Sequence, residues 1–339
     1  MKTKLLGYAI LFSLFPVLAS AQLVKKDDTT ERNYFDADGK MRIAIAKQPQ
    51  RPSSGGGKNA LDGPDVMANG GIQDILRKMN ATVRVSNAEL SDREKTEYGN
   101  WRKMGYANGR LADNIMQNEA DGYFTVAYLA SCPSALGVLG GLQQSLTSTD
   151  TSSVSIMWLD AHADYNTPET TRSGSMGGMP LAIANGLGLH QVRRDSKVEP
   201  PLPASHIVTA GLRDVDPGEQ HLLDVNRIEN ITVDDIRSIS QNVYEQMDAL
   251  SAVSDKIYIH IDLDILDAKE VPFHNYPTEN GPTSYELAAM FKEIFAKYPK
   301  AAAIGFASIP ANDPDDITLN AVNRMTVAAI EGIKIREGR

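Results

Sequence analysis

The chain has 339 residues, of which 42% are hydrophobic and 23% charged, an ordinary composition for a globular protein with one large core. Its net charge of −9 and its lack of a basic block argue against a nucleic-acid-binding surface. Cys132 is the single cysteine, so an internal disulfide is excluded.

The N-terminus has the pattern of an export signal. Lys2 and Lys4 precede an apolar run, and residues 19–21 form a small-x-small cleavage pattern. The run is short for a transmembrane span, and an uncleaved anchor is the alternative. We therefore expect a signal peptide over residues 1–21 and a periplasmic or secreted mature chain, without a membrane-spanning segment. Residues 22–40 are polar and charged and are expected to form a flexible leader.

Strands and helices alternate from residue 41 onward. Strands are predicted at 41–46, 81–85, 122–129, 153–159, 206–211, 256–263 and 301–309. Helices are predicted at 64–79, 94–119, 134–146, 177–185, 233–250, 284–295 and 317–335. This alternation predicts a single α/β domain over 41–339, with a parallel sheet between two helical layers in a three-layer α-β-α arrangement. Ligands of such sheets gather at the carboxyl ends of the strands.

Two of the predicted strands end in acidic residues. Asp160, His162 and Asp164 follow one strand, and Asp262 and Asp264 follow another. On an extended chain every second side chain points the same way, so each set can converge on one point. Crowded carboxylates repel one another unless cations lie between them, and carboxylates with one imidazole suit a divalent ion such as Mn²⁺. The alternative is that two strand ends are acidic and solvated.

These segments resemble the arginase (ureohydrolase) family over most of residues 41–335. The most specific matches are Asp-Ala-His-Ala-Asp-Tyr-Asn-Thr-Pro at 160–168 with Ser-Gly at 173–174, Gly-Leu-Arg-Asp-Val-Asp-Pro-Gly-Glu at 211–219, and Asp-Leu-Asp-Ile-Leu-Asp at 262–267. The resemblance implies a parallel sheet of about eight strands with a site for two manganese ions. It also implies hydrolysis of a C–N bond of a guanidino compound, such as arginine or hydroxyarginine, by hydroxide generated at the metal.

The resemblance also implies roles for individual residues. The implied metal ligands are Cys132, Asp160, His162, Asp164, Asp262 and Asp264. Asp164 matches the carboxylate that also contacts the hydroxide, so it is the expected catalytic residue. The implied substrate contacts are Asn166, Ser173, Asp216 and Glu219. Two Mn²⁺ ions per chain are expected, with one ion as the alternative, and a homotrimer or homohexamer is the implied assembly.

Three positions depart from the family pattern. Cys132 lies where a histidine ligand is usual, as in the similar Nω-hydroxyarginine hydrolases; a thiolate can bind a divalent ion, and a buried structural thiol is the alternative. Gly177 replaces a histidine that is thought to shuttle protons. Ser308 replaces a glutamate that pairs with the guanidinium, so ordinary arginine is expected to be a poor substrate.

Several alternatives remain open at this stage. The segment 216–219 also fits a turn that opens a helix. His260 points to the same side as Asp262, either as a packed core residue or as a hydrogen-bond partner of a ligand carboxylate. His274, in a proline-containing loop, has no interpretation from sequence. The second functional hypothesis is a non-catalytic protein that binds metal or ligand on an arginase scaffold, and the third is hydrolysis of another C–N bond, such as an amide or formimino group.

Overall fold

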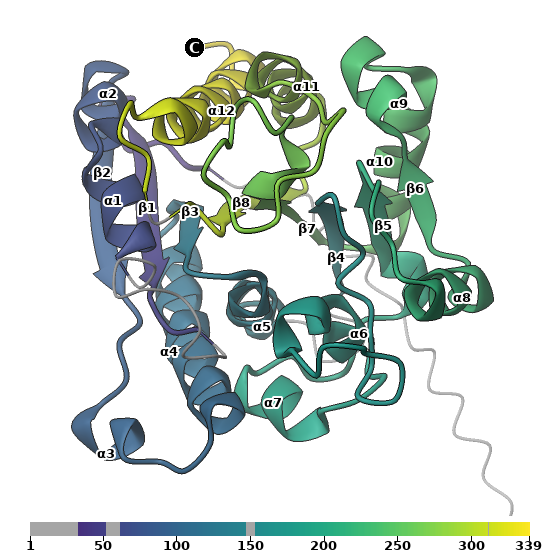
Figure 1. The fold of residues 1–339 in the computed structure, drawn as a ribbon. Coiled ribbons are helices and arrows are strands. Elements are labelled where there is room, and N and C mark those ends of the chain that lie inside the picture. Colours follow the sequence, from purple (N-terminus) through teal and green to yellow (C-terminus); the bar gives the residue numbers. More distant parts are fainter. Residues whose placement is uncertain (1–32, 52–61, 147–152, 311) are drawn as a thin grey trace, which may run out of the picture. The chain divides into compact units, whose positions relative to one another are not determined.

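The central element of the protein is an eight-stranded parallel sheet (Figure 1). The computed structural model describes residues 33–51, 62–146, 153–310 and 312–339. The strands are β1 (Met41–Gln48), β2 (Ala81–Asn87), β3 (Phe124–Leu129), β4 (Val154–Leu159), β5 (Ile207–Ala210), β6 (Glu229–Ile231), β7 (Lys256–Asp262) and β8 (Ala301–Ala307). Their order is β2-β1-β3-β8-β7-β4-β5-β6, and each of the paired strands runs parallel to its neighbour.

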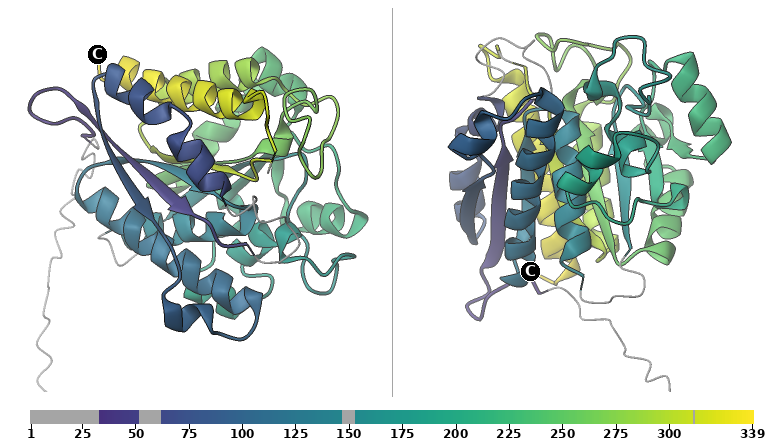
Figure 2. Two further views of the ribbon diagram at one scale, coloured as in Figure 1. Left: turned by 60° about the vertical axis from the view of Figure 1, so that its left-hand side comes forward. Right: turned by 90° about the horizontal axis from the view of Figure 1, so that it is seen from below.

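Helices cover both faces of the sheet, which confirms the predicted three-layer fold (Figure 2). One face carries α1 (Gly63–Asn69), α2 (Ile72–Lys78), α9 (Val233–Ser238), α10 (Gln241–Val253), α11 (Ser284–Lys297) and α12 (Ile317–Arg336). The other face carries α4 (Asn100–Ala120), α5 (Ala135–Gln144), α6 (Pro180–Ala184), α7 (His190–Asp195) and α8 (Pro217–Asn226). The short α3 (Asp92–Lys95) precedes α4 and buries no side chain.

Local chemistry explains where the predicted boundaries were wrong. The helix predicted over 64–79 is divided into α1 and α2, because Gly71 adopts a positive φ of 85°. The helix predicted over 233–250 is divided at Ile239, after which Ser240 caps α10 by accepting from the Asn242 N–H. The sequence patterns also missed α7 and β6, which are short, and they gave the start of α8 only as an alternative for 216–219.

The end of the predicted leader is part of the folded unit. Tyr34 and Phe35 are buried, and Phe35 forms an antiparallel bridge with Met41 at the start of β1. The prediction of a flexible leader is therefore wrong for these two residues, whose apolar side chains join the core. The predicted signal peptide lies outside the described residues. Among the described helices, none is long and apolar enough to cross a membrane.

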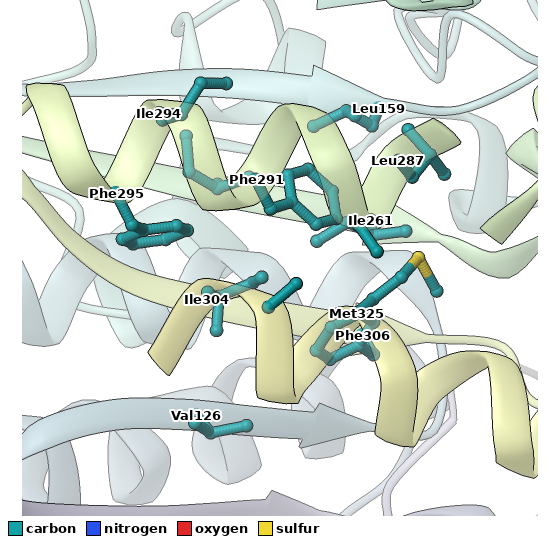
Figure 3. Close-up of a cluster of buried hydrophobic side chains, with 14 of the residues drawn as sticks. Val126, Leu159, Ile261, Leu287, Phe291, Ile294, Phe295, Ile304, Phe306 and Met325 are labelled. Carbon is teal, nitrogen blue, oxygen red and sulfur yellow. The ribbon is translucent and has the colours of Figure 1, made fainter. Parts of the chain in front are cut away.

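The core between the sheet and the α11–α12 pair supports the strands that end in acidic residues. Figure 3 shows Phe291 and Phe295 of α11 packed with Met325 of α12 over Ile261 and Phe306 of the sheet. α11 begins with a capping box in which Thr283 and Glu286 satisfy each other's backbone N–H groups. Because Ile261 directly precedes Asp262, this core holds Asp262 in position at the end of β7.

We predict that Phe291→Ala lowers the free energy of unfolding by about 3–5 kcal/mol, because it leaves a large cavity under β7. Urea denaturation with circular dichroism measures this loss. The control is Tyr98→Ala, whose side chain is 97% exposed and should change stability by less than about 0.5 kcal/mol. Equal stability of the two variants would contradict this account of the core.

Candidate metal centre

The acidic residues meet at the carboxyl ends of β4 and β7, which are neighbours in the middle of the sheet. Asp160 follows β4 directly, and Asp262 is the last residue of β7. The side chains of Asp160, Asp262 and Asp264 are all buried. A parallel sheet places its strand ends on one edge, so the two motifs, far apart in sequence, contribute to one site.

Cys132 reaches the same site from a different strand. It begins a 3₁₀ turn (Cys132–Ser134) just after β3, and Pro133 at the second position favours that turn. Its Sγ lies 2.6 Å from Asp262 Oδ2. The single thiol of the chain is therefore placed against a carboxylate of the second acidic motif.

The first acidic motif converges through an irregular loop. β4 ends at Leu159, and Asp164 adopts a left-handed φ of 48°, so the alternation expected of an extended chain does not aim these side chains. Asp160 instead accepts the His162 backbone N–H at 2.7 Å, and His162 Nδ1 lies 3.1 Å from Asp264 Oδ2. A non-glycine residue at positive φ stores strain, and such strain is concentrated at functional sites.

The donor atoms form three overlapping sets whose members lie within 4.8 Å of one another. These sets are Cys132 with Asp160 and Asp164, Asp160 with His162 and Asp264, and Asp262 with Asp264 and His274. The six ligands implied by the sequence are thus brought to one place. Carboxylate and imidazole donors that share members between sets suit two adjacent divalent ions bridged by carboxylates.

The electrostatics of this cluster call for positive charge. Burial, together with neighbouring carboxylates, raises the pKa of Asp160 and of Asp164 well above the ordinary value. Burial alone would lower the pKa of His162, yet its bonds to Asp160 and Asp264 raise that pKa to about 12. The negative charge of the cluster is therefore unfavourable in the folded protein, and divalent ions fit the residues present.

His274 is a site residue that the sequence patterns did not identify. Its Nε2 lies 3.7 Å from Asp262 Oδ1, its Nδ1 lies 4.0 Å from Asp264 Oδ2, and the residue is only 9% exposed. The loop between β7 and α11 also brings Asn275 and Tyr276 to the cavity wall. A loop position without strand or helix periodicity carries no signal for such a role, which explains the omission.

A cavity of about 420 Å³ opens beside the cluster, large enough for a small organic molecule. The predicted substrate residues all line it: Asn166, Ser173, Asp216 and Glu219. Asn166 Nδ2 lies 3.4 Å from Asp216 Oδ2. Asn166 and Asp216 can therefore bind the polar end of a small substrate, and the exposed Ser173 lies at the mouth.

Glu219 differs from Asn166, Ser173 and Asp216 because both of its carboxylate oxygens already accept hydrogen bonds. They accept the backbone N–H groups of Tyr165 and Asp216 at 3.0 Å each. The bond to Asp216 completes the capping box of α8, so the alternative of a helix-opening turn is also realised at 216–219. Glu219 thus holds the loop after Asp164 against the segment that carries Asp216.

The departures from the family pattern also lie at the cavity. Gly177 lines it and presents no side chain that could carry a proton. Ser308 adopts a positive φ of 68° and donates to Asp262 Oδ2 at 2.7 Å, so its hydroxyl hydrogen is used within the cluster. Among the described residues beyond it, Asp313, Asp315 and Asp316 do not line the cavity, and Asp313 accepts the Leu319 N–H in the first turn of α12.

His260 combines the two roles left open by the sequence. It is fully buried in the core, and burial lowers the pKa of its imidazole to about 3. Its Nε2 also lies 3.4 Å from Cys132 Sγ, and Tyr258 Oη lies 3.0 Å from its Nδ1. The contacted group is the thiol of Cys132, whereas the second of the two sequence alternatives named a ligand carboxylate.

Comparisons with known proteins agree with this geometry. The model of the arginase family matches residues 134–330 and begins just beyond Cys132. Arginase of Bacillus caldovelox is 26% identical over 244 residues, which cover 69% of this chain and 80% of that protein. Human mitochondrial arginase-2 is 31% identical over 201 residues, covering 58% of this chain and 55% of that protein. The crystal structure of arginase from Bacillus subtilis has the same fold, with a TM-score of 0.74 at 22% identity over 85% of this chain and 98% of that one.

We predict that Asp164→Asn stabilises the metal-free protein, because it removes one of the buried carboxylates that repel one another. The gain should be about 1–3 kcal/mol at pH 8. Folding raises the pKa of Asp164 above its unfolded value of 3.8. The stabilisation of the folded state that follows from this shift is fully present below pH 3.8 and is lost as the pH rises through the pKa of the folded protein. The advantage of the variant should therefore shrink as the pH falls from 8 to 5.

Urea denaturation of protein treated with a chelator measures this difference at both pH values. Asp92→Asn, which changes a fully exposed carboxylate, is the control and should show no such trend. A variant that is less stable than the wild type at both pH values would contradict the proposed repulsion.

Proposed function

The chain belongs to the arginase family, and on this premise we propose that it is an exported binuclear manganese hydrolase that cleaves a C–N bond of a guanidino compound. The observation that carries the proposal is the convergence of four buried carboxylates, two imidazoles and one thiol beside a cavity of small-molecule size. The pattern of residues 1–21 motivates the proposal of export.

The residues that would hold two ions fall into three overlapping groups. Cys132, Asp160 and Asp164 form the first, Asp160, His162 and Asp264 the second, and Asp262, Asp264 and His274 the third. Such ions, when bound, supply Lewis-acid polarisation of water and of the substrate. Mn²⁺ is proposed because carboxylate oxygens dominate the donor set and imidazole and thiolate are minor components.

The chain's own groups then bind the substrate and move protons. Asp164 faces the cavity from a fixed, strained loop, so its carboxylate can accept a proton from the attacking water and return it to the departing nitrogen. Asn166 and Asp216 hold the polar end of the substrate, and Glu219 fixes both of their loops through backbone bonds. This arrangement holds the reacting carbon near the cluster.

The absence of a carboxylate at position 308 favours a less basic guanidino group. A guanidinium ion presents five N–H donors and is best bound by a bidentate carboxylate. An N-hydroxyl group lowers the basicity of the guanidine, so the missing partner matters less. We therefore propose hydroxyarginine as a better substrate than arginine, with the Ser308 bond to Asp262 as the supporting observation.

We predict that the manganese-loaded mature protein hydrolyses hydroxyarginine with a kcat/KM at least about tenfold above that for arginine, because arginine lacks one charge-assisted pairing. Release of urea or hydroxyurea from arginine, hydroxyarginine, agmatine and guanidinobutyrate measures this ratio.

Asp164→Asn should reduce kcat by about 10²-fold or more, as expected for loss of a proton-transfer group.

The protein for this assay is recovered from the periplasm or the medium, and its N-terminus is sequenced to test export. A chain that retains its first 21 residues would contradict a cleaved signal peptide. Binding of manganese and a guanidino compound without turnover of any of the four would overturn the hydrolase proposal. That result would favour the non-catalytic binding protein, which is motivated by the three departures from the family pattern together, at Cys132, Gly177 and Ser308.

A further inference from the structure

A buried chain of hydrogen bonds lies behind Cys132, on the side away from the proposed substrate. Tyr258 Oη lies 3.0 Å from His260 Nδ1, and His260 Nε2 lies 3.4 Å from Cys132 Sγ. Tyr258 and His260 are fully buried, and Cys132 is 3% exposed. Neither Tyr258 nor His260 is among the cavity-lining residues or the proposed metal ligands.

The direction of these bonds follows from counting protons. The thiol has one proton, and Cys132 donates it to Asp262 Oδ2 at 2.6 Å. His260 must therefore be the donor in its contact with the sulfur, through Nε2–H. A neutral imidazole carries one N–H, so its Nδ1 is an acceptor, and Tyr258 must donate its hydroxyl hydrogen to it.

Packing on both neighbouring strands holds this arrangement. The Trp158 ring on β4 lies against the imidazole, with ring centroids 4.0 Å apart and planes inclined by 31°. On β8, Gly305 pairs with His260 in the sheet, and a Cβ at that position would lie 2.2 Å from Tyr258 Oη. Glycine at 305 therefore makes the space that the hydroxyl needs to reach His260.

We propose that Tyr258 and His260 are positioning residues that fix an N–H donor on Cys132 Sγ and so support the sulfur as a metal ligand. The inference rests on the proposed metal role of Cys132. A bound metal would displace the thiol proton to solvent, because the thiolate is the form that ligates. The Nε2–H donor then stabilises the negative charge on a sulfur that lies among buried carboxylates.

Cobalt(II) is the probe, because a cysteine thiolate bound to it gives a sulfur-to-metal charge-transfer band in the near ultraviolet. The test compares wild type with Tyr258→Phe, which removes only the hydroxyl that fixes the imidazole proton. Tyr128→Phe is the matched control, since Tyr128 is also fully buried on a strand and its hydroxyl contacts Thr326. Cys132→Ser assigns the band to this sulfur, and circular dichroism establishes that each variant is folded.

The inference predicts a band in the wild type that Cys132→Ser abolishes. In Tyr258→Phe the band should move to longer wavelength, because loss of the N–H donor raises the energy of the sulfur electrons, and cobalt affinity should fall by about tenfold. Tyr128→Phe should change neither quantity. His260→Ala should move the band at least as far as Tyr258→Phe.

Two results would overturn the inference, and they are distinguishable. An unchanged band and affinity in both Tyr258→Phe and His260→Ala would refute the positioning role while leaving Cys132 as a ligand. A cobalt-loaded wild type without a sulfur band would refute the metal role of Cys132 itself, and the inference with it.

Discussion

The mutual repulsion of buried carboxylates is the constraint on which this structure depends. Asp160, Asp164, Asp262 and Asp264 lie together, nearly buried, at the wall of one cavity, and their mutual repulsion favours bound cations. The parallel sheet meets this constraint by placing the ends of β4 and β7 side by side, while the α11–α12 core supports the strands from one face. The positive φ of Asp164 strains the backbone and directs its carboxylate to the cluster.

The departures from the family pattern lie around the metal ligands and leave the acidic ligands themselves unchanged. The carboxylates are kept, whereas the groups that would face a guanidinium and carry its proton differ at Ser308 and Gly177. His274 and Tyr276 reach the cavity wall from the loop before α11. Ligand residues that match the family, beside different residues at positions 177 and 308, support the proposal of a guanidino substrate other than arginine.

The sequence predicted features that follow from regular patterns. Alternating strands and helices predicted the three-layer parallel fold, and two acidic strand ends predicted where the cluster forms. The position of His274 was not predictable, because an irregular loop has no periodicity that reports its direction. The contact of His260 with Cys132 was missed for a different reason: alternation gives the face of a strand, but only the neighbouring strands decide which atom on that face it meets.

The most direct test of the central claim is the metal content of the mature protein after equilibration with Mn²⁺ and removal of unbound ions, beside a Cys132→Ala variant. A carboxylate-bridged binuclear site predicts about two ions per chain in the wild type and a fall toward one in the variant. One ion or none in both proteins would contradict the account, because the buried carboxylates would then be neutralised in another way.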